Sequence, residues 1–106
     1  MKILYKEPGK PCEVKEIENK LEVMQELVSG LIEIVPFDNV LLICNEEGKI
    51  MNLEPNLLYD FDYIAGNCFL VGDDFENGSF KSLTDEEIEL YEKELNKHNF
   101  INKGEF

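Results

Sequence analysis

The sequence contains no arginine. Its ten cations are all lysines, set against 23 Asp and Glu residues, which leaves a net charge of −13. Arginine is the side chain best suited to bidentate phosphate capture, so its absence weighs against strong binding of phosphate groups. A strongly negative field also repels nucleic acids and anionic membranes and attracts basic protein surfaces. The composition therefore predicts a protein partner with a basic surface, and it predicts no direct binding of nucleic acid or membrane.

Features that mark membrane, secreted and disordered chains are missing too. No apolar run approaches the roughly 20 residues needed to span a bilayer. The segment from Met1 to Glu7 meets a charge at once, where a signal peptide would have an apolar stretch. Disordered chains have low hydrophobicity, whereas 43% of these residues are hydrophobic. We expect a folded cytoplasmic protein.

Potential metal ligands and nucleophiles are scarce. Cys12, Cys44 and Cys68 are odd in number and far apart, and His98 is the only histidine. Structural zinc sites use closely spaced ligand pairs, and nothing near these cysteines marks an activated thiolate. We therefore predict no metal and no cofactor. Cys44 and Cys68 lie within apolar runs, so we expect both to be small buried hydrophobes.

No constellation typical of an enzyme is present, because the chain has no Ser-His-Asp arrangement, no phosphate-cradling glycine loop and no metal-ligand spacing. The segment from Asp74 to Gly78 resembles a calcium loop only superficially. Counted from Asp74, glycine falls fifth and Asp85 twelfth, whereas the EF-hand pattern needs glycine sixth and glutamate twelfth. The sequence favours a non-enzymatic binding protein.

The hydrophobic pattern predicts one α+β domain over residues 1–98, followed by a frayed tail over residues 99–106. Two helices are expected, and their order among the strands gives a largely antiparallel sheet of about five strands with both helices packed on it. A short edge strand near Phe80 completes the pattern. The main strands are expected at residues 3–5, 12–17, 31–35, 40–44 and 63–71.

The two helices begin with different sequence signals. Thr84 and Glu87 have the spacing of a capping box, and Asn19 and Glu22 form a similar pair before the first helix. Each helix carries one apolar stripe, which we expect to be buried against the sheet. The residues of these stripes are Leu21, Met24, Leu27, Ile88, Tyr91 and Leu95.

Residues 52–59 are predicted to form a helical turn or an ordered loop, because Pro55 argues against a regular central strand. Asparagine amides recognise hydrogen-bonding edges and an aromatic ring can stack on a base, so this loop could bind a small nucleotide-like molecule. The alternative is a rigid loop whose asparagines bond to neighbouring backbone. The candidate residues are Asn52, Glu54, Pro55, Asn56 and Tyr59.

The acidic residues are concentrated after the first helix. From Gly30 onward 17 acids oppose five lysines, whereas before it six acids oppose five lysines. Acids at the start of the last helix complement its dipole, but seven others fall in predicted turns or strand ends without a local structural reason. They either aid solubility or form an acidic face that mimics nucleic-acid phosphates and binds a basic protein. These residues are Glu46, Glu47, Asp60, Asp62, Asp73, Asp74 and Glu76.

Several segments carry a family resemblance when taken together and in order: the opening MKILYKEPGKPCEVKEIEN, Leu31–Pro36, Cys44–Lys49, Pro55-Asn56, Ile64–Gly66, Phe69–Gly72 and Ser82–Ile88. From Lys2 to about Tyr91 the chain resembles a family of small acidic proteins that is itself a domain of unknown function. That family occurs in low-GC Gram-positive bacteria and on their phages, plasmids and integrative elements. In it the loop usually reads Pro-Pro-Asn-Arg, and here Glu54 and Leu57 stand in the first Pro and the Arg positions.

The resemblance implies a mobile-element setting and brings no reaction with it. In that setting, an acidic protein that inhibits a host defence or nucleic-acid-binding protein would be useful to the element. The leading hypothesis is therefore a binding protein that acts through its acidic face. The alternative is a protein that binds or sequesters a nucleotide-like small molecule through residues 52–59. The sequence leaves the oligomeric state open.

Overall fold

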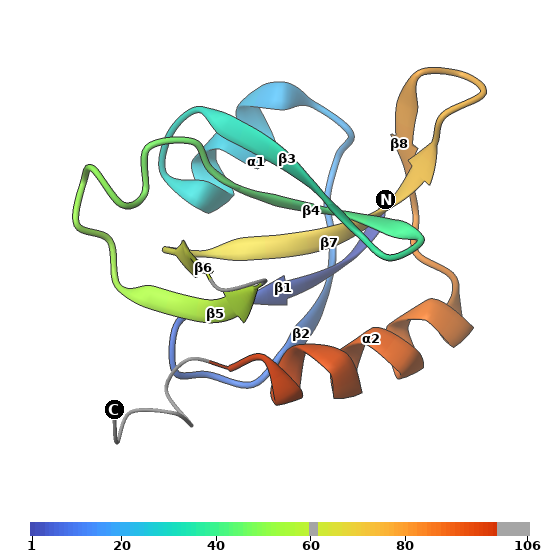
Figure 1. Ribbon diagram of the computed structural model, residues 1–106. Coiled ribbons are helices and arrows are strands. Elements are labelled where there is room, and N and C mark those ends of the chain that lie inside the picture. The colour runs from blue at the N-terminus through green and yellow to red at the C-terminus, as the bar shows by residue number, and fades with distance from the viewer. Residues whose placement is uncertain (60–61, 100–106) are drawn as a thin grey trace.

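The computed structural model describes residues 1–59 and 62–99, which form two α-helices and two antiparallel sheets (Figure 1). The main sheet has six strands in the order β2-β1-β7-β4-β3, with β8 paired to the far end of β7, and β5 pairs with β6 in a separate ribbon. The expected α+β fold with a largely antiparallel sheet is confirmed. The elements are β1 (Lys2–Lys6), β2 (Glu13–Glu16), α1 (Leu21–Val28), β3 (Ile32–Phe37), β4 (Val40–Asn45), β5 (Pro55–Tyr59), β6 (Asp62–Ala65), β7 (Cys68–Asp74), β8 (Ser79–Lys81) and α2 (Asp85–Lys97).

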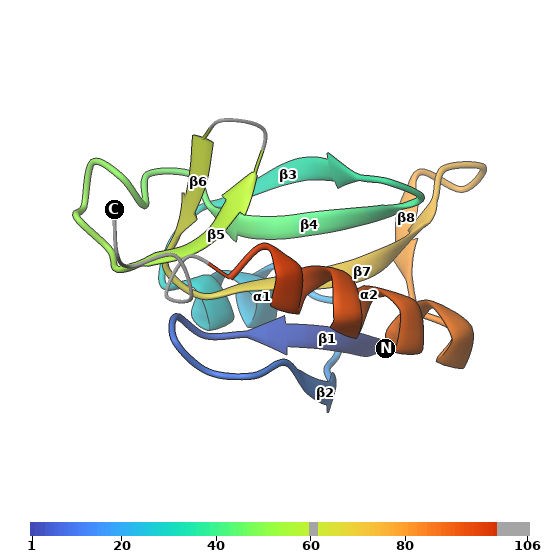
Figure 2. The same ribbon diagram turned by 60° about the horizontal axis from the view of Figure 1, so that its bottom comes forward.

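The central strands β1, β7 and β4 are covered on both faces. The two helices lie on opposite sides of the sheet, as Figures 1 and 2 show. Successive residues of a strand point to opposite faces, so Ile43 packs in the cluster under α1 while Leu42 and Cys44 pack in the cluster under α2. This explains the uninterrupted apolar run of β4, which is typical of a central strand covered on both faces.

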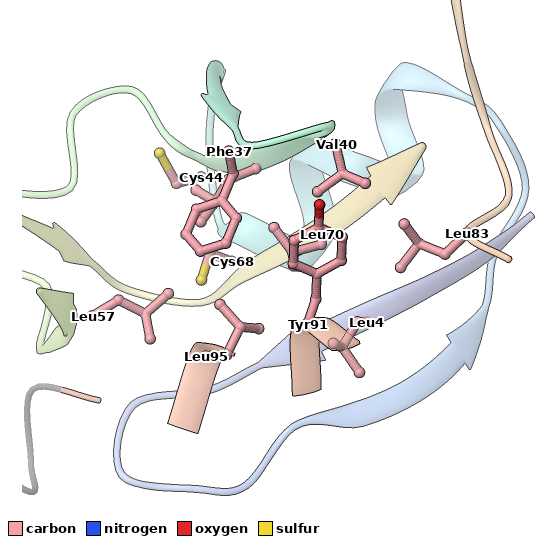
Figure 3. Close-up of a cluster of buried hydrophobic side chains, with 11 residues drawn as sticks. Leu4, Phe37, Val40, Cys44, Leu57, Cys68, Leu70, Leu83, Tyr91 and Leu95 are labelled. Atoms are coloured by element: carbon pink, nitrogen blue, oxygen red, sulfur yellow. The ribbon is translucent and has the colours of Figure 1, made fainter. Parts of the chain in front are cut away.

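Tyr91 of α2 anchors the helix to the β3–β4 turn. Its ring packs in the core beside Val40 and Leu70 (Figure 3), and the side chain is only 2% exposed. The phenol O–H donates to Asp38 Oδ2 at 3.0 Å and accepts from the Asn39 N–H at 3.3 Å. The aromatic body therefore contributes apolar burial while its polar tip holds a turn that lies far away in sequence.

Changing Tyr91 to Phe is expected to lower the free energy of unfolding by about 1 kcal/mol, because the apolar contacts stay and the two hydrogen bonds are lost. Asp38→Asn is the matched control. Asn keeps an oxygen acceptor and tolerates the positive φ of 56° at this position. Urea unfolding of both variants measures the difference, and equal stability of Tyr91→Phe and the parent would show that the bonds contribute nothing.

Of the two predicted helix caps, one is confirmed and one is wrong. The capping box of α2 is confirmed, with Glu87 N–H donating to Thr84 Oγ1 and Thr84 N–H donating to Glu87 Oε1. The expected cap of α1 by Asn19 is wrong. The N-cap is Lys20, and the Asn19 amide donates to the Ser79 hydroxyl and the Phe80 carbonyl in the β7–β8 hairpin.

No helix among the described residues is long and apolar enough to cross a membrane.

Burial of the helix stripes is confirmed at Met24, Tyr91 and Leu95, which are at most 2% exposed, while Leu27 and Ile88 are half-buried. Leu21 is 53% exposed, so its expected burial is wrong. Side chains of a helix tilt toward its N-terminus, and Leu21 is the first residue of α1. Its side chain therefore extends beyond the helix start instead of over the sheet.

The expectation of a turn or loop at residues 52–59 is also wrong in part, because residues 55–59 form β5. Pro55 is the first residue of this strand, a position where the missing N–H costs little, and a bulge follows between Pro55 and Leu57. The strand expected at 63–71 is divided. Gly66, with φ of 86°, separates β6 in the ribbon from β7 in the main sheet.

The end of α2 joins the ribbon to the rest of the domain. The Leu58 N–H donates to the His98 carbonyl at 2.6 Å, and His98 Nδ1 lies 3.0 Å from the Leu58 carbonyl. Asn99, the first residue of the expected tail, forms an isolated bridge with Leu57. The remaining tail residues, 100–106, lie outside the described residues.

Candidate functional site

The turn that follows β4 is held by the buried side chain of Asn45. Its amide donates to the carbonyls of Val28 and Ser29 at the end of α1, at 3.0 and 3.2 Å, and its Oδ1 accepts from the Glu47 N–H at 2.7 Å. One 5% exposed asparagine thus ties α1 to the turn. As a consequence, Glu46 and Glu47 have a fixed backbone beneath exposed side chains.

The same turn lies directly against the ribbon. A Cβ added to Gly48 would meet the Ala65 carbonyl oxygen of β6 at 2.6 Å, so only glycine permits this approach. Between the turn, β3 and β6 lies a cavity of about 350 Å³, which we call the acidic pocket. Its charged lining consists of Glu33, Glu46, Glu47, Lys49 and Asp62.

Lys49 is the single cation of the acidic pocket, and it is already engaged. Its ammonium forms an ion pair with Asp62 and lies 4.8 Å from the centre of the Tyr63 ring. Its hydrogen bond lowers the pKa of the Asp62 carboxyl. Four carboxylates thus share one lysine, and the pocket favours a positively charged group.

A thiol lies at the base of the pocket, where Cys44 Sγ is 3.9 Å from Glu33 Oε1. Burial, together with the charge of Glu33, raises the pKa of Cys44 to about 12. Burial likewise raises the pKa of Cys12 to about 11 and raises that of Cys68. All three thiols are therefore protonated at neutral pH, the opposite of an activated nucleophile.

Native alkylation should follow the exposure of these thiols. Cys44 and Cys68 are at most 2% exposed, as we expected, and should react with iodoacetamide only as fast as the protein opens, whereas the half-buried Cys12 should react sooner. Mass spectrometry of the native protein measures the order, and the urea-unfolded protein supplies the full-rate control. Rapid native labelling of Cys44 would show that the pocket is open down to the thiol.

The other predicted acids lie on the β7–β8 hairpin. Asp73 and Asp74 end β7 and are half-buried, whereas Glu76 lies exposed at the tip. Asp74 accepts two hydrogen bonds from the Asn77 amide, which shapes the turn. Beside the hairpin runs a groove of about 510 Å³ lined by Ile34, Leu41, Phe75 and Phe80 together with Asn19 and Asp73, which we call the apolar groove.

The predicted acids therefore gather in two places. Glu46, Glu47 and Asp62 line the acidic pocket, whereas the hairpin holds Asp73, Asp74 and Glu76. Asp60 lies outside the described residues. Among the ion pairs of the described residues, Asp62 is the single member of this set with a lysine partner.

The residues of the loop candidate do not converge on one cavity. Asn52 is exposed in a left-handed turn with φ of 57°, and Glu54 is also exposed. Pro55 is half-buried at the start of β5. Asn56 is fully buried, and the side chain of Tyr59 lies outside what the structure describes.

Asn56 has a structural role within a buried network. Its Oδ1 accepts from the ammonium of Lys6 at 3.0 Å, while its amide donates to the Lys6 carbonyl at 3.0 Å and the Gly66 carbonyl at 2.8 Å. Lys6 itself is 0% exposed, and its ammonium also donates to the Glu7 carbonyl at 2.8 Å. Burial lowers the pKa of Lys6. This arrangement fits the rigid-loop alternative for Asn56.

The sequence analysis did not single out Glu33, Lys49 or Lys6. Glu33 lies between apolar residues of β3, a pattern that indicates a half-exposed strand. This pattern does not indicate that Glu33 lines the acidic pocket. Lys49 follows a glycine turn, and its pairing with Asp62 is a long-range contact. No local signal distinguishes the buried Lys6 from the half-buried Lys2 or the exposed Lys10.

No group of three or more His, Cys, Asp or Glu within residues 1–59 and 62–99 is arranged to hold a metal ion. A profile of the family described as a domain of unknown function (DUF3846) matches residues 1–96. No curated protein and no solved structure matches the chain.

Proposed function

This chain belongs to the DUF3846 family, a domain of unknown function, and we propose that it acts as a non-enzymatic protein that binds a basic partner through its acidic surface. The observation that carries the proposal is the acidic pocket. There, four carboxylates surround one lysine that is already paired with Asp62. A cationic side chain entering this cavity would meet an excess of negative charge.

The hairpin adds a second acidic area to the same proposal. Asp73, Asp74 and Glu76 take part in none of the ion pairs found among residues 1–59 and 62–99. Neutralising lysines are scarce across the whole chain, which carries a net charge of −13. Such a field speeds encounter with a basic surface and suppresses binding of acidic ones.

We propose that the chain serves a mobile element by occupying the nucleic-acid site of a host defence or other nucleic-acid-binding protein. Duplex DNA presents one charge per roughly 1.7 Å of its axis, so proteins that bind it carry basic clefts that a small acidic domain can enter. The resemblance to proteins of phages and plasmids supports this setting, and we propose a cytoplasmic location for the complex.

The contacts of Asn56 favour this proposal over a small-molecule site in residues 52–59. An asparagine that binds a ligand must have its side-chain amide free. In Asn56 both the amide oxygen and the amide nitrogen already form hydrogen bonds with buried protein groups. The exposed members, Asn52 and Glu54, lie on the surface of a turn. The acidic pocket, by contrast, presents its charged groups to solvent.

Affinity capture from a lysate of the source cell tests the proposal with three variants. The pocket variant is Glu46→Gln with Glu47→Gln, the hairpin variant is Asp73→Asn with Glu76→Gln, and the loop variant is Asn52→Gly with Glu54→Gln. We expect a basic protein to be retained by the parent and by the loop variant at about 0.1 M salt, and to be lost at about 1 M, where the Debye length shrinks from roughly 10 to 3 Å.

The two acidic variants should retain clearly less of that protein while unfolding at the parent's temperature. Glu46, Glu47 and Glu76 are exposed acids, which contribute little to stability, and the half-buried Asp73 takes part in none of the ion pairs of the described residues. The proposal would be overturned if the partner is still captured at about 1 M salt and both acidic variants retain as much of it as the parent. If the loop variant alone loses the partner, the alternative hypothesis, binding through residues 52–59, would be favoured instead.

A further inference from the structure

The strand β3 is one edge of the main sheet, as Figure 2 shows. It pairs with β4 on one side, and no other described strand pairs with it on the other. Edge strands present a row of backbone groups that can pair with another extended chain. The opposite edge of the sheet, β2, offers a comparison within the same molecule.

The register shows which backbone groups of β3 point outward. The Glu46 N–H donates to the Leu31 carbonyl at 2.8 Å, so this pair is hydrogen-bonded and every second residue after Leu31 turns its backbone toward β4. Ile32, Ile34 and Pro36 therefore turn their backbone away from β4. Pro36 fits this position because the N–H that it lacks would not belong to the β3–β4 ladder.

The side chains of β3 line the two hollows described above, one on each face of the sheet. Glu33 and Val35 line the acidic pocket on the side of α2 and the ribbon. Ile34 lines the apolar groove on the other side, together with Phe75, which is 79% exposed. A strand added beside β3 would thus place alternate side chains over an acidic pocket and over an apolar groove.

We propose that an extended partner segment with alternating basic and apolar residues binds by adding a strand to the β3 edge. The inference rests on the proposed function, because it names how a basic partner would use the acidic pocket. Main-chain hydrogen bonds to Ile32 and Ile34 supply register, and the two hollows supply side-chain selection. A second copy of this chain fits poorly as the occupant, since each copy carries a net charge of −13.

The β2 edge provides a matched control. Met1 and Ile17 exchange backbone hydrogen bonds at 2.9 and 2.7 Å, so the same alternation turns the Val14 N–H outward, away from β1. Val14 is 46% exposed and Ile34 is 50% exposed. Ile34→Pro and Val14→Pro each remove one outward N–H from an edge strand without removing a bond from its ladder, and they leave the net charge unchanged.

The test uses fluorescence anisotropy with a labelled peptide of about six residues, in which Lys and Val alternate, at about 0.1 M salt. A peptide of the same composition with its Lys and Val in separate blocks is the second probe. We expect the alternating peptide to bind the parent and Val14→Pro equally, and to bind Ile34→Pro at least about tenfold more weakly. Hydrogen exchange of the Ile34 amide should also slow when the alternating peptide binds the parent.

Methylating alternate backbone nitrogens of the peptide tests the same contact on the intact parent, so the result does not depend on how well Ile34→Pro folds. One set of methylated positions should abolish binding and the other should be tolerated. Equal binding of the alternating and block peptides would overturn strand addition while leaving the proposed function standing. Absence of binding by either peptide would count against both. Self-association that disappears in Ile34→Pro would identify a second copy as the occupant and overturn the inference.

Discussion

Replacing Asn56 with alanine is expected to lower the free energy of unfolding by about 3 kcal/mol, because each buried polar group left without a partner costs about 1–3 kcal/mol. The substitution would remove the acceptor of the buried Lys6 ammonium and the donor to the Lys6 and Gly66 carbonyls. A domain of this size has a total stability of about 5–15 kcal/mol, so the loss would be a large fraction of it. Urea unfolding followed by circular dichroism measures the change.

Asn77→Ala is the control for Asn56→Ala. Its amide also makes side-chain hydrogen bonds, to Asp74, but in an exposed hairpin where water can replace them. That variant should therefore lose no more than about 0.5 kcal/mol, as surface substitutions usually do. A loss below about 1 kcal/mol for Asn56→Ala would mean that Lys6 and the two carbonyls find other partners, and the structural role of Asn56 would be withdrawn.

The second large effect concerns association. Neutralising Glu46 and Glu47 to glutamine should slow association with the basic partner by about tenfold at about 0.1 M salt, since complementary fields raise association rates by roughly 10–1,000-fold. Both side chains are exposed, so the fold should be unaffected. Stopped-flow or surface-based kinetics with the purified partner measure the rate constants directly.

Glu89→Gln with Glu92→Gln controls for net charge alone. These residues are exposed on α2, and the pair of changes removes the same two charges from another part of the surface. At about 0.1 M salt the Debye length is roughly 10 Å, so charges outside the contact should change the rate less than twofold. Equal slowing by both pairs would show that overall charge, and not the acidic pocket, drives the encounter.

Local sequence patterns were sufficient for the elements that depend on local chemistry. The capping box of α2, the apolar run of β4 and the antiparallel order of the sheet all follow from residue type and spacing. They were insufficient where a long-range contact competes with a local one. Asn19 has the character of a helix cap, but its amide bonds to the hairpin at Ser79 and Phe80. Pro55 argues against a central strand, and it does not exclude a strand in a separate ribbon.

The same distinction applies to the candidate site. Charge and turn position marked Glu46 and Glu47, which line the acidic pocket. Glu33 was missed because its neighbours along the chain are apolar, and only the approach of β6 turns that part of β3 into one wall of a cavity. Asn56 was assigned a possible ligand role from its amide, and only the tertiary fold shows that this amide faces the buried Lys6.

If the acidic surface binds the partner, the rate constant for association with the captured partner should depend strongly on salt. The rate constant of the parent should fall steeply between about 0.1 and 1 M salt, as the Debye length shrinks from roughly 10 to 3 Å. The Glu46→Gln, Glu47→Gln variant should start lower and converge with the parent at high salt. Rate constants that do not change with salt, and are the same for parent and variant throughout, would show that the acidic surface does not drive binding.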